Sequence, residues 1–423
     1  MTTTPGPSGG VSDTTSWSAG PILTGSQVAL TVVLNWTAPA SDPSYASASG
    51  YAVYRRPNSG AFVKIGTVAA GVLTYTDTAP VLGTTYQYYV TPLWPSASIA
   101  QSNQISLLIL PPAMFIVTAT NSATSTANYL YSSDGVNWTL GTFPSAAQWA
   151  GSAYSPSLGR WVVLRGLANS TVCVTSDDGG VTWTNRTCQS GNWFAVAWSP
   201  TLSLFAAVSV DSPGLIQTSP DGVTWTSRTS PATGTLQEII WSSRLGLFIA
   251  GSSTFGSAPV TTSPDGINWT NRTFAGSRTY SAATLADNGT IIAADTQDSL
   301  DWTETSANGT SWSLVAATQQ TEALGQFGTK FTGYFSTGSL QKIFTSPDAV
   351  TWTQVTTPAA MASNFRVLNC RYSPLLGVHV GATNASGATA QPIVYTKDNV
   401  TFNLATVPGG LPGGPFWRVG VAL

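Results

Sequence analysis

The sequence predicts an all-β protein of more than one domain, and two observations carry this prediction. Short runs rich in Val, Thr, Ile, Tyr and Trp alternate with polar residues, and Gly, Pro, Asn and Asp interrupt them every few residues. This pattern is typical of strands joined by tight turns, and almost no stretch has a helical period. In addition, a polar turn followed by tryptophan recurs: "TSPDGVTWTSRT" (218–229) returns as "TSPDGINWTNRT" (262–273).

Composition excludes several classes of function. Charged residues make up only 8% of the chain, against about 25% in an average soluble protein, and the formal net charge is −2. We therefore expect no binding to nucleic acid, which a basic surface would require. No apolar run reaches about 18 residues, so membrane insertion is not expected. Residues 1–20 lack the basic and apolar segments of a secretory signal.

Cysteine and histidine are too rare to suggest a cofactor. The three cysteines, Cys173, Cys188 and Cys370, are too few for a disulfide framework, and no spacing of cysteine and histidine indicates a metal site. We predict no metal and no cofactor. Cys173 and Cys188 flank one of the recurring turns, and the sequence leaves open whether they form a disulfide or stay reduced. The only histidine, His379, lies in the apolar stretch "LLGVHVGA" and is predicted to pack in a strand.

The first quarter of the chain is predicted to contain a tail and a separate domain. Residues 1–20 are rich in Gly, Pro, Ser and Thr, as expected of an extended tail that anchors the protein. Residues 21–110 contain strands such as "QVALTVVLNWTAP" and "TTYQYYVTPLW", with Trp36 and Tyr86 as candidate core aromatics. This region resembles a fibronectin type III domain, a two-sheet sandwich that buries one large aromatic from each sheet. The resemblance implies a spacer that positions the next domain.

Residues 111–423 are predicted to form a ring of repeated sheets. The recurring aromatics lie 40 to 50 residues apart: Trp138, Trp183, Trp225, Trp269, Trp312, Trp352 and Phe402. Four short strands per repeat at this period are typical of β-propeller blades. "MFIVTAT" (114–120) lacks a strand before it and "FWRVGVAL" (416–423) lacks one after it, so together they complete one blade. The prediction is a seven-bladed propeller closed by both ends of the domain, with Val419 beside Ile116.

The recurring turn resembles the Asp-box, SxDxGxxW, of sialidases, sortilin-like receptors and many phage virion proteins. Only residues 176–183 keep its full spacing, and the other six turns are one residue shorter. A short acidic or amide side chain can accept hydrogen bonds from amides of its own turn, glycine supplies a positive φ, and the aromatic residue packs between blades. We therefore assign structural roles to these aromatics and to Asp134, Asp178, Asp221, Asp265, Asn308, Asp348 and Asp398.

Because sialidases share this turn, catalysis must be considered. Their chemistry uses three arginines, a tyrosine nucleophile backed by a glutamate and an acidic proton donor. Arg278, Arg366 and Arg418, with Glu238 and Glu322, fall on predicted innermost strands. However, the predicted register puts Arg278 and Arg366 at one level and Arg418, with Glu238, three residues deeper, which is a poor carboxylate clamp. We therefore predict no catalytic residues and no enzyme activity.

The combined features resemble a structural protein of a tailed-phage particle, in the tail, a fibre or the capsid decoration. This resemblance implies a virion location, contacts of the tail and sandwich with other virion subunits, and a propeller displayed for host attachment. If the propeller binds host glycans, Trp149, Trp193 and Trp302 are the candidates for stacking on sugars. A sialidase-like glycoside hydrolase and a bacterial cell-surface adhesin remain alternatives. The sequence leaves homo-oligomerisation, stoichiometry and the ligand open.

Overall fold

The structure is a computed structural model of the 423-residue chain, which divides into two compact units, residues 1–109 and 110–423. The expected boundary lay one residue later, between residues 110 and 111. The structure describes residues 21–28, 31–38, 48–81, 84–93, 101–109, 114–119, 126–166, 169–252, 260–272, 284–287, 290–294, 302–316, 320–337, 340–358, 365–385, 393–408 and 417–422. The expected N-terminal tail, residues 1–20, lies outside the described residues.

The described residues contain strands and no helix, in agreement with the all-β prediction. The described residues therefore also lack a helix long and apolar enough to cross a membrane. All pairings between named strands are antiparallel, including that between β8 and β35 from the two ends of the second unit.

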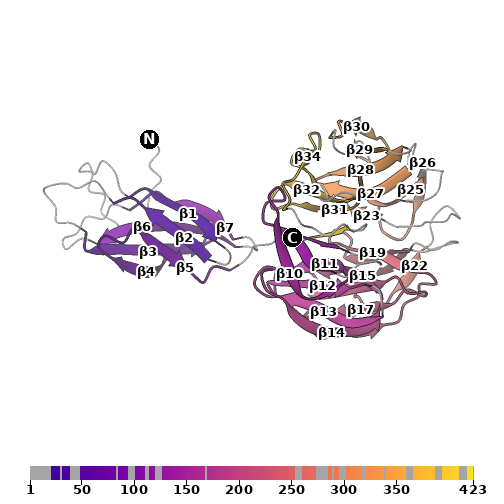
Figure 1. The fold of residues 1–423 in the computed structure, drawn as a ribbon, viewed down its shortest axis with the longest axis horizontal. Helices are drawn as coiled ribbons and strands as arrows, with labels where there is room; N and C mark the ends of the chain where they lie inside the picture. Colours follow the sequence, from indigo (N-terminus) through magenta and orange to yellow (C-terminus); the bar gives the residue numbers. More distant parts are fainter. Residues whose placement is uncertain are drawn as a thin grey trace. The chain divides into compact units, whose positions relative to one another are not determined.

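The first unit consists of two antiparallel sheets (Figure 1). One has the order β1-β2-β5 and the other the order β4-β3-β6-β7. Their strands are β1 (Leu23–Val28), β2 (Thr31–Trp36), β3 (Gly50–Pro57), β4 (Val63–Ala69), β5 (Thr74–Asp77), β6 (Thr85–Leu93) and β7 (Ile105–Leu108). Trp36 and Tyr86, the predicted core aromatics, are buried in one apolar cluster, and Trp36 packs edge-on against Tyr51 with ring centroids 5.4 Å apart.

The second unit repeats one four-stranded sheet along the chain. The first strands are β11 (Trp149–Ser155), β15 (Trp193–Ser199), β19 (Leu236–Ser242), β23 (Thr284–Asp287), β27 (Gln320–Phe327) and β31 (Phe365–Ser373). The second strands are β12 (Arg160–Arg165), β16 (Leu204–Ser209), β20 (Leu247–Ser252), β24 (Ile291–Ala294), β28 (Lys330–Thr337) and β32 (Val378–Ala385). The third strands are β13 (Ser170–Ser176), β17 (Ile216–Ser219), β21 (Val260–Ser263), β25 (Trp302–Ser306), β29 (Leu340–Ser346) and β33 (Ile393–Thr396). The fourth strands are β14 (Thr184–Gly191), β18 (Thr226–Arg228), β22 (Thr270–Arg272), β26 (Ser313–Ala316), β30 (Thr353–Val355) and β34 (Asn403–Leu404).

One further sheet of this unit joins its two ends. It has the order β10-β9-β8-β35, built from β8 (Phe115–Ala119), β9 (Thr126–Ser132), β10 (Thr139–Ala147) and β35 (Trp417–Val421). Val419 pairs with Val117, and Gly420 pairs with Ile116. The expected neighbours Val419 and Ile116 therefore lie in the same sheet, one residue out of the expected register.

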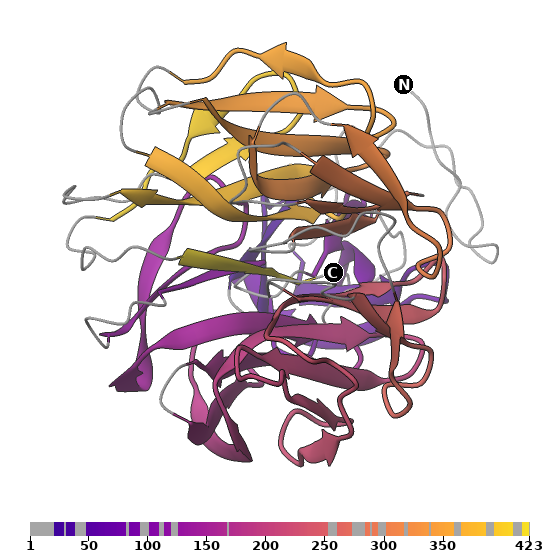
Figure 2. The same ribbon diagram turned by 90° about the vertical axis from the view of Figure 1, so that its right-hand side faces the viewer.

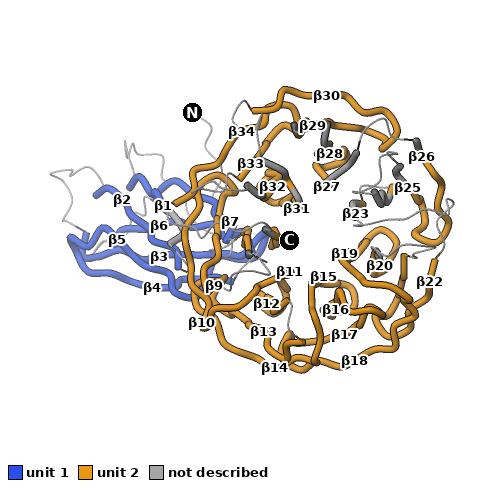
Figure 3. Tube along the Cα trace, turned by 45° about the vertical axis from the view of Figure 1, so that its right-hand side comes forward, with its two compact units in different colours: residues 1–109 blue, residues 110–423 orange. Residues whose placement is uncertain are grey.

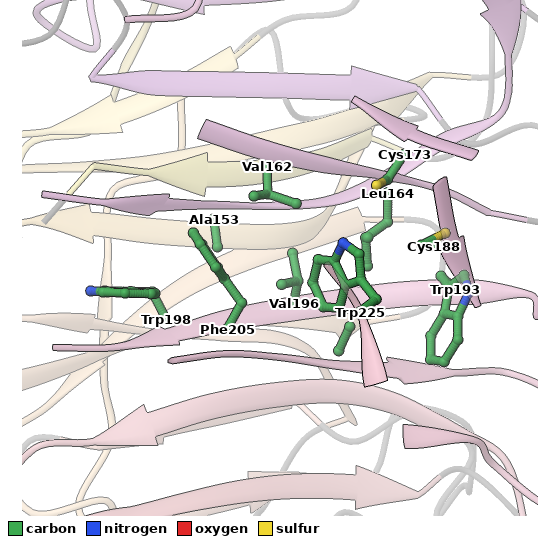
Figure 4. Packing of buried hydrophobic residues seen from close by; sticks show 11 residues of the cluster. Ala153, Val162, Leu164, Cys173, Cys188, Trp193, Val196, Trp198, Phe205 and Trp225 are labelled. Atoms are coloured by element: carbon green, nitrogen blue, oxygen red, sulfur yellow. The ribbon is translucent and has the colours of Figure 1, made fainter. Parts of the chain in front are cut away.

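The sheets of the second unit lie side by side around a common axis, with their first strands innermost (Figures 2 and 3). Buried apolar side chains fill the space between adjacent sheets. One such layer brings Val162 and Leu164 of one sheet against Val196, Phe205 and Trp225 of the next (Figure 4). The sheets on either side of such a layer therefore use apolar residues of their strands in packing.

Candidate functional site

The recurring turns hold their acidic side chains by local hydrogen bonds. In the turn at 219–225, Oδ1 of Asp221 accepts hydrogen bonds from the amides of Val223 (2.8 Å) and Thr224 (2.7 Å). The hydroxyl of Ser219 donates to the same oxygen at 2.9 Å and accepts the amide of Gly222 at 2.7 Å. Gly222 has φ 72°, a conformation that glycine adopts without steric cost. The side chains thus satisfy amides that the tight turn would otherwise leave unpaired.

The same network forms in the other six turns. Asp134, Asp265, Asp348 and Asp398 each accept the amides two and three residues further on, and Asn308 does so through its side-chain oxygen. In the longer turn, Asp178 accepts from the amides three and four residues on. Where glycine is replaced, Ala349 and Asn399 still adopt positive φ values of 68° and 57°. The geometry of the turn therefore tolerates substitution at several of its positions.

Hydrogen bonding also keeps these carboxyl groups ionised. The amides of Thr401 and Val400 lower the pKa of Asp398 to about 2. Burial raises the pKa of Asp265, but hydrogen bonds from Asn268 and Ile267 outweigh it and lower the pKa to about 2. An acid that donates a proton near neutral pH needs a raised pKa instead. These two aspartates are therefore unsuited to that role.

In five of the seven turns, the aromatic residue that ends the turn packs against the preceding sheet. Trp225 lies in a cluster with Val162 and Leu164, and Trp269 lies in a cluster with Ala206 and Val208. The indole nitrogens of Trp138, Trp225, Trp269 and Trp352 also donate to the carbonyl three residues earlier, at 3.1 to 3.3 Å. Trp312 and Phe402 are buried in equivalent clusters, and Trp183 is half-buried with its ring edge-on to Phe143.

Two of the three predicted sugar-binding tryptophans, Trp149 and Trp193, are buried and cannot stack on a sugar, so the prediction is wrong for these two. Trp149 is 0% exposed and Trp193 is 1% exposed. Their indole nitrogens donate to the carbonyls of Ser145 (3.2 Å) and Gln189 (2.7 Å), so the two rings fill the space at the start of β11 and β15. Trp302 belongs to β25, but its side chain lies outside the described residues.

A cluster of charged side chains spans the axis of the second unit. Glu238 on β19 is 3% exposed and binds two arginines from the other side of the ring. Its Oε1 accepts from Arg371 of β31 at 2.6 Å, and its Oε2 accepts from Arg418 of β35 at 3.4 Å. Arg418 and Glu238 were expected at one depth, and their contact agrees with that register. Arg371 was not predicted, although its strand, "FRVLNCRYSP", was.

The guanidinium of Arg418 is enclosed on several sides. It lies over the ring of Phe194, with Cζ 3.8 Å from the ring centroid, and donates to the carbonyl of Gln237 at 3.2 Å. Desolvation lowers its pKa despite the attraction of Glu238. The side chains of the other expected channel residues, Arg278, Arg366 and Glu322, lie outside the described residues. Arg371 and Arg418 thus both bind Glu238 and do not surround an open site for a ligand carboxylate.

The cysteines and the histidine are buried. Cys173 and Cys188 are free thiols, and no disulfide joins them (Figure 4). A hydrogen bond to Cys188, together with burial, raises the pKa of Cys173. His379 is fully buried in β32, as predicted, with Nδ1 3.0 Å from the carbonyl of Gln326. The part of the chain that the structure describes contains no group of three or more His, Cys, Asp or Glu side chains that could hold a metal.

Comparisons with known proteins find similar solved structures but no family. No family model and no curated protein matches the chain. Among solved structures, a Lactobacillus plantarum protein matches with 9% identity and a TM-score of 0.54, covering 73% of this chain and 99% of its own. YCF48 bound to D1 peptide matches with 16% identity, a TM-score of 0.47, and coverage of 62% and 82%. The WD40 β-propeller domain of Doa1 matches with 13% identity, a TM-score of 0.42, and coverage of 59% and 79%.

The second unit has the fold of a β-propeller. Its repeated four-stranded antiparallel sheets are those of propeller blades, as the sequence period predicted. At such low identities these similarities concern the fold alone, and they carry no activity or ligand over to this chain.

Proposed function

We propose that this protein is a non-enzymatic structural protein of a phage particle that displays its propeller for attachment to a host surface. In this proposal the propeller has seven blades of the Asp-box type, and it is closed where β35 completes the sheet of β8, β9 and β10. The first unit is a fibronectin type III domain, consistent with its two sheets and the buried pair Trp36 and Tyr51. Residues 1–20 and this domain contact other virion subunits.

The observation that carries the proposal is how the described acidic side chains are used. The acidic and amide residues of the seven turns bind their own backbone, and Glu238 is paired with two arginines. A glycosidase needs two carboxyl groups on either side of an accessible bond, one of them with a raised pKa. Because these side chains serve packing and turn geometry, a role in binding and display fits the molecule better than catalysis.

The test combines location, binding and activity. Antibodies raised against the purified protein are applied to intact phage particles from the source culture and located by immunogold electron microscopy. Fluorescently labelled protein is added to bacterial cells to measure binding. In a separate assay, the purified protein is incubated with host polysaccharides and sialosides, and the release of reducing sugar and free sialic acid is measured. We expect gold on the particles, saturable cell binding and no sugar release. Particles without gold, or sugar release by the purified protein, would contradict the proposal.

A further inference from the structure

Three successive blades carry an arginine at the same position of their outermost strand. Arg186 of β14, Arg228 of β18 and Arg272 of β22 each lie three residues after the tryptophan of the turn, in the repeated sequences "WTNRT", "WTSRT" and "WTNRT". These strands are neighbours at the outer edge of the ring (Figure 3). In the other four blades the equivalent positions are occupied by Gly141, Val315, Val355 and Ala405. The arginines therefore mark one arc of the rim.

Each of these guanidinium groups is fixed in the same way. Nε donates to a threonine hydroxyl on the adjacent third strand, to Thr175 at 3.0 Å, to Thr218 at 2.8 Å and to Thr262 at 2.9 Å, respectively. A hydrogen bond at Nε orients the planar fork, so that the two terminal amino groups stay together for a second partner. Among the described residues, none of the three forms an ion pair. Their positive charges are therefore held in place without being neutralised by a carboxylate.

A groove lies beside the middle arginine. Ser227, Arg228 and Thr229 line one wall, and Ile267, Asn268 and Trp269 from the turn of the next blade line the other. It is an open groove with a volume of about 390 Å³. Ile267 is 50% exposed and offers an apolar surface, while the hydroxyls of Ser227 and Thr229 and the side-chain oxygen of Asn268 offer hydrogen-bonding groups.

The nearest turn carboxylate does not block this groove. Oδ1 of Asp265 accepts the amides of Ile267 and Asn268, and its Oδ2 accepts the side-chain amide of Asn268 at 2.8 Å. The carboxylate therefore serves its own turn, and the guanidinium of Arg228 remains the open charged group that lines the groove. A guanidinium fork with its two amino groups free matches a planar carboxylate or a sulfate.

We propose that the rim arc of Arg186, Arg228 and Arg272 binds an anionic polysaccharide. Its carboxylate or sulfate groups pair with the three guanidinium groups, and a sugar ring lies in the groove against Ile267. This inference rests on the proposed function and specifies the surface and the ligand class for attachment. Because the sites recur from blade to blade, a chain long enough to reach two of them gains affinity by effective concentration.

The test measures binding of defined polymers to the full-length protein by isothermal titration calorimetry at low and physiological salt. The ligands are dextran sulfate, polygalacturonate and neutral dextran, each as a short oligomer and as a long chain. The triple variant Arg186→Gln, Arg228→Gln, Arg272→Gln is compared with Lys330→Gln, Lys342→Gln, Lys397→Gln, which removes the same charge from other blades. We expect the arginine variant to lose at least about tenfold in affinity for both anionic polymers and the lysine variant to change little. We also expect long chains to bind more tightly than short ones.

Three results would overturn the inference: equal losses in the two triple variants, equal affinity for neutral dextran, or no binding of either anionic polymer to the unmodified protein. A cell-binding assay with the same variants separates this inference from the proposed function. If the arginine variant still binds cells as the unmodified protein does, attachment stands but the rim arc is not its site. If the unmodified protein binds no cells, the attachment function itself fails.

Discussion

At the scale of single residues, the buried side chain of His379 shows how burial changes the pKa of a polar group. His379 is fully buried, with Tyr334 stacked at a centroid separation of 6.0 Å. The carbonyl of Gln326 accepts a hydrogen bond from Nδ1, so the neutral ring carries its proton there and Nε2 has no partner among the described groups. Burial, together with the positive charge of Arg371, lowers the pKa of His379 to about 4, despite the hydrogen bond to Gln326.

The first prediction follows from this pKa. Because the folded pKa of about 4 lies below the ordinary value of about 6.5, the unfolded chain binds the proton first as the pH falls. His379 therefore contributes stability that is complete above pH 6.5 and is lost between about pH 6.5 and 4, amounting to about 3 kcal/mol. Urea denaturation at several pH values across this range measures the slope of the free energy of unfolding against pH. The variant His379→Gln should lose most of the slope above pH 5, and an unchanged slope would contradict the assignment.

The second prediction concerns the acidic turn. Replacing Asp221 by alanine removes the acceptor of two turn amides and of the Ser219 hydroxyl. We expect the free energy of unfolding to fall by about 1 to 2 kcal/mol, because this loss resembles the loss of a helix cap. Asp221→Asn keeps the Oδ1 acceptor, as Asn308 does in another turn, and should cost less than half as much. Equal losses in the two variants would show that charge, rather than hydrogen bonding, holds the turn.

At the scale of elements, the turn of one blade fits against the strands of the blade before it. A Cβ added at Gly222 would lie 2.6 Å from Cγ2 of Val162 on the preceding sheet, and one at Gly266 would lie 2.5 Å from Cδ2 of Leu204. Arg160 of the preceding sheet also donates to the carbonyl of Asp221 at 2.6 Å. The turn therefore serves two purposes, since it reverses its own chain and forms part of the interface between blades.

The third prediction tests this close approach. Gly222→Ala must place a side chain at φ 72° and within 2.6 Å of Val162, so we expect a loss of about 1 to 3 kcal/mol. Adding Val162→Ala makes room for the new methyl group but leaves the backbone strain. A double-mutant cycle by chemical denaturation should therefore show a favourable coupling between the two substitutions. Additive losses would mean that backbone strain alone explains the effect.

Local features of the elements could be predicted from the sequence, whereas contacts between elements could not. The turns were predictable because Ser219, Asp221 and Gly222 bind within the same short segment. Arg371 was missed because its partner, Glu238, is 133 residues away in the chain. Trp149 was misassigned because an aromatic residue at the start of a strand can face solvent or pack inward. The structure shows that Trp149 packs inward, because its ring lies against that of Phe143 with the two ring centroids 4.7 Å apart.

At the scale of the propeller, the axial cluster links parts of the chain that are far apart. Glu238 lies on the middle sheet of the second unit, whereas Arg371 lies on its last sheet and Arg418 on the final strand. The final strand is also held by Asn369, whose Oδ1 accepts the amide of Val419 at 2.9 Å. Gly420 lies so close to Ser152 that a Cβ there would be 2.0 Å from its hydroxyl oxygen. The attachment of β35 thus depends on contacts with the blades on either side and on one across the axis.

The last prediction tests the contact across the axis. Glu238→Gln leaves Arg418 enclosed by Phe194 and Gln237 without a counter-charge, and breaking a buried pair in this way costs about 3 kcal/mol. The substitution also leaves Arg371 unpaired, but its side chain is more exposed than that of Arg418. Adding Arg418→Gln removes the more enclosed of the two unpaired charges and should restore part of the loss. Since β35 carries Arg418, hydrogen exchange of the amides of 417–421 should speed up in Glu238→Gln while exchange in β17 stays unchanged. If stability and exchange of β35 both match the unmodified protein, the pairing with β8 holds the final strand without help from the axial cluster.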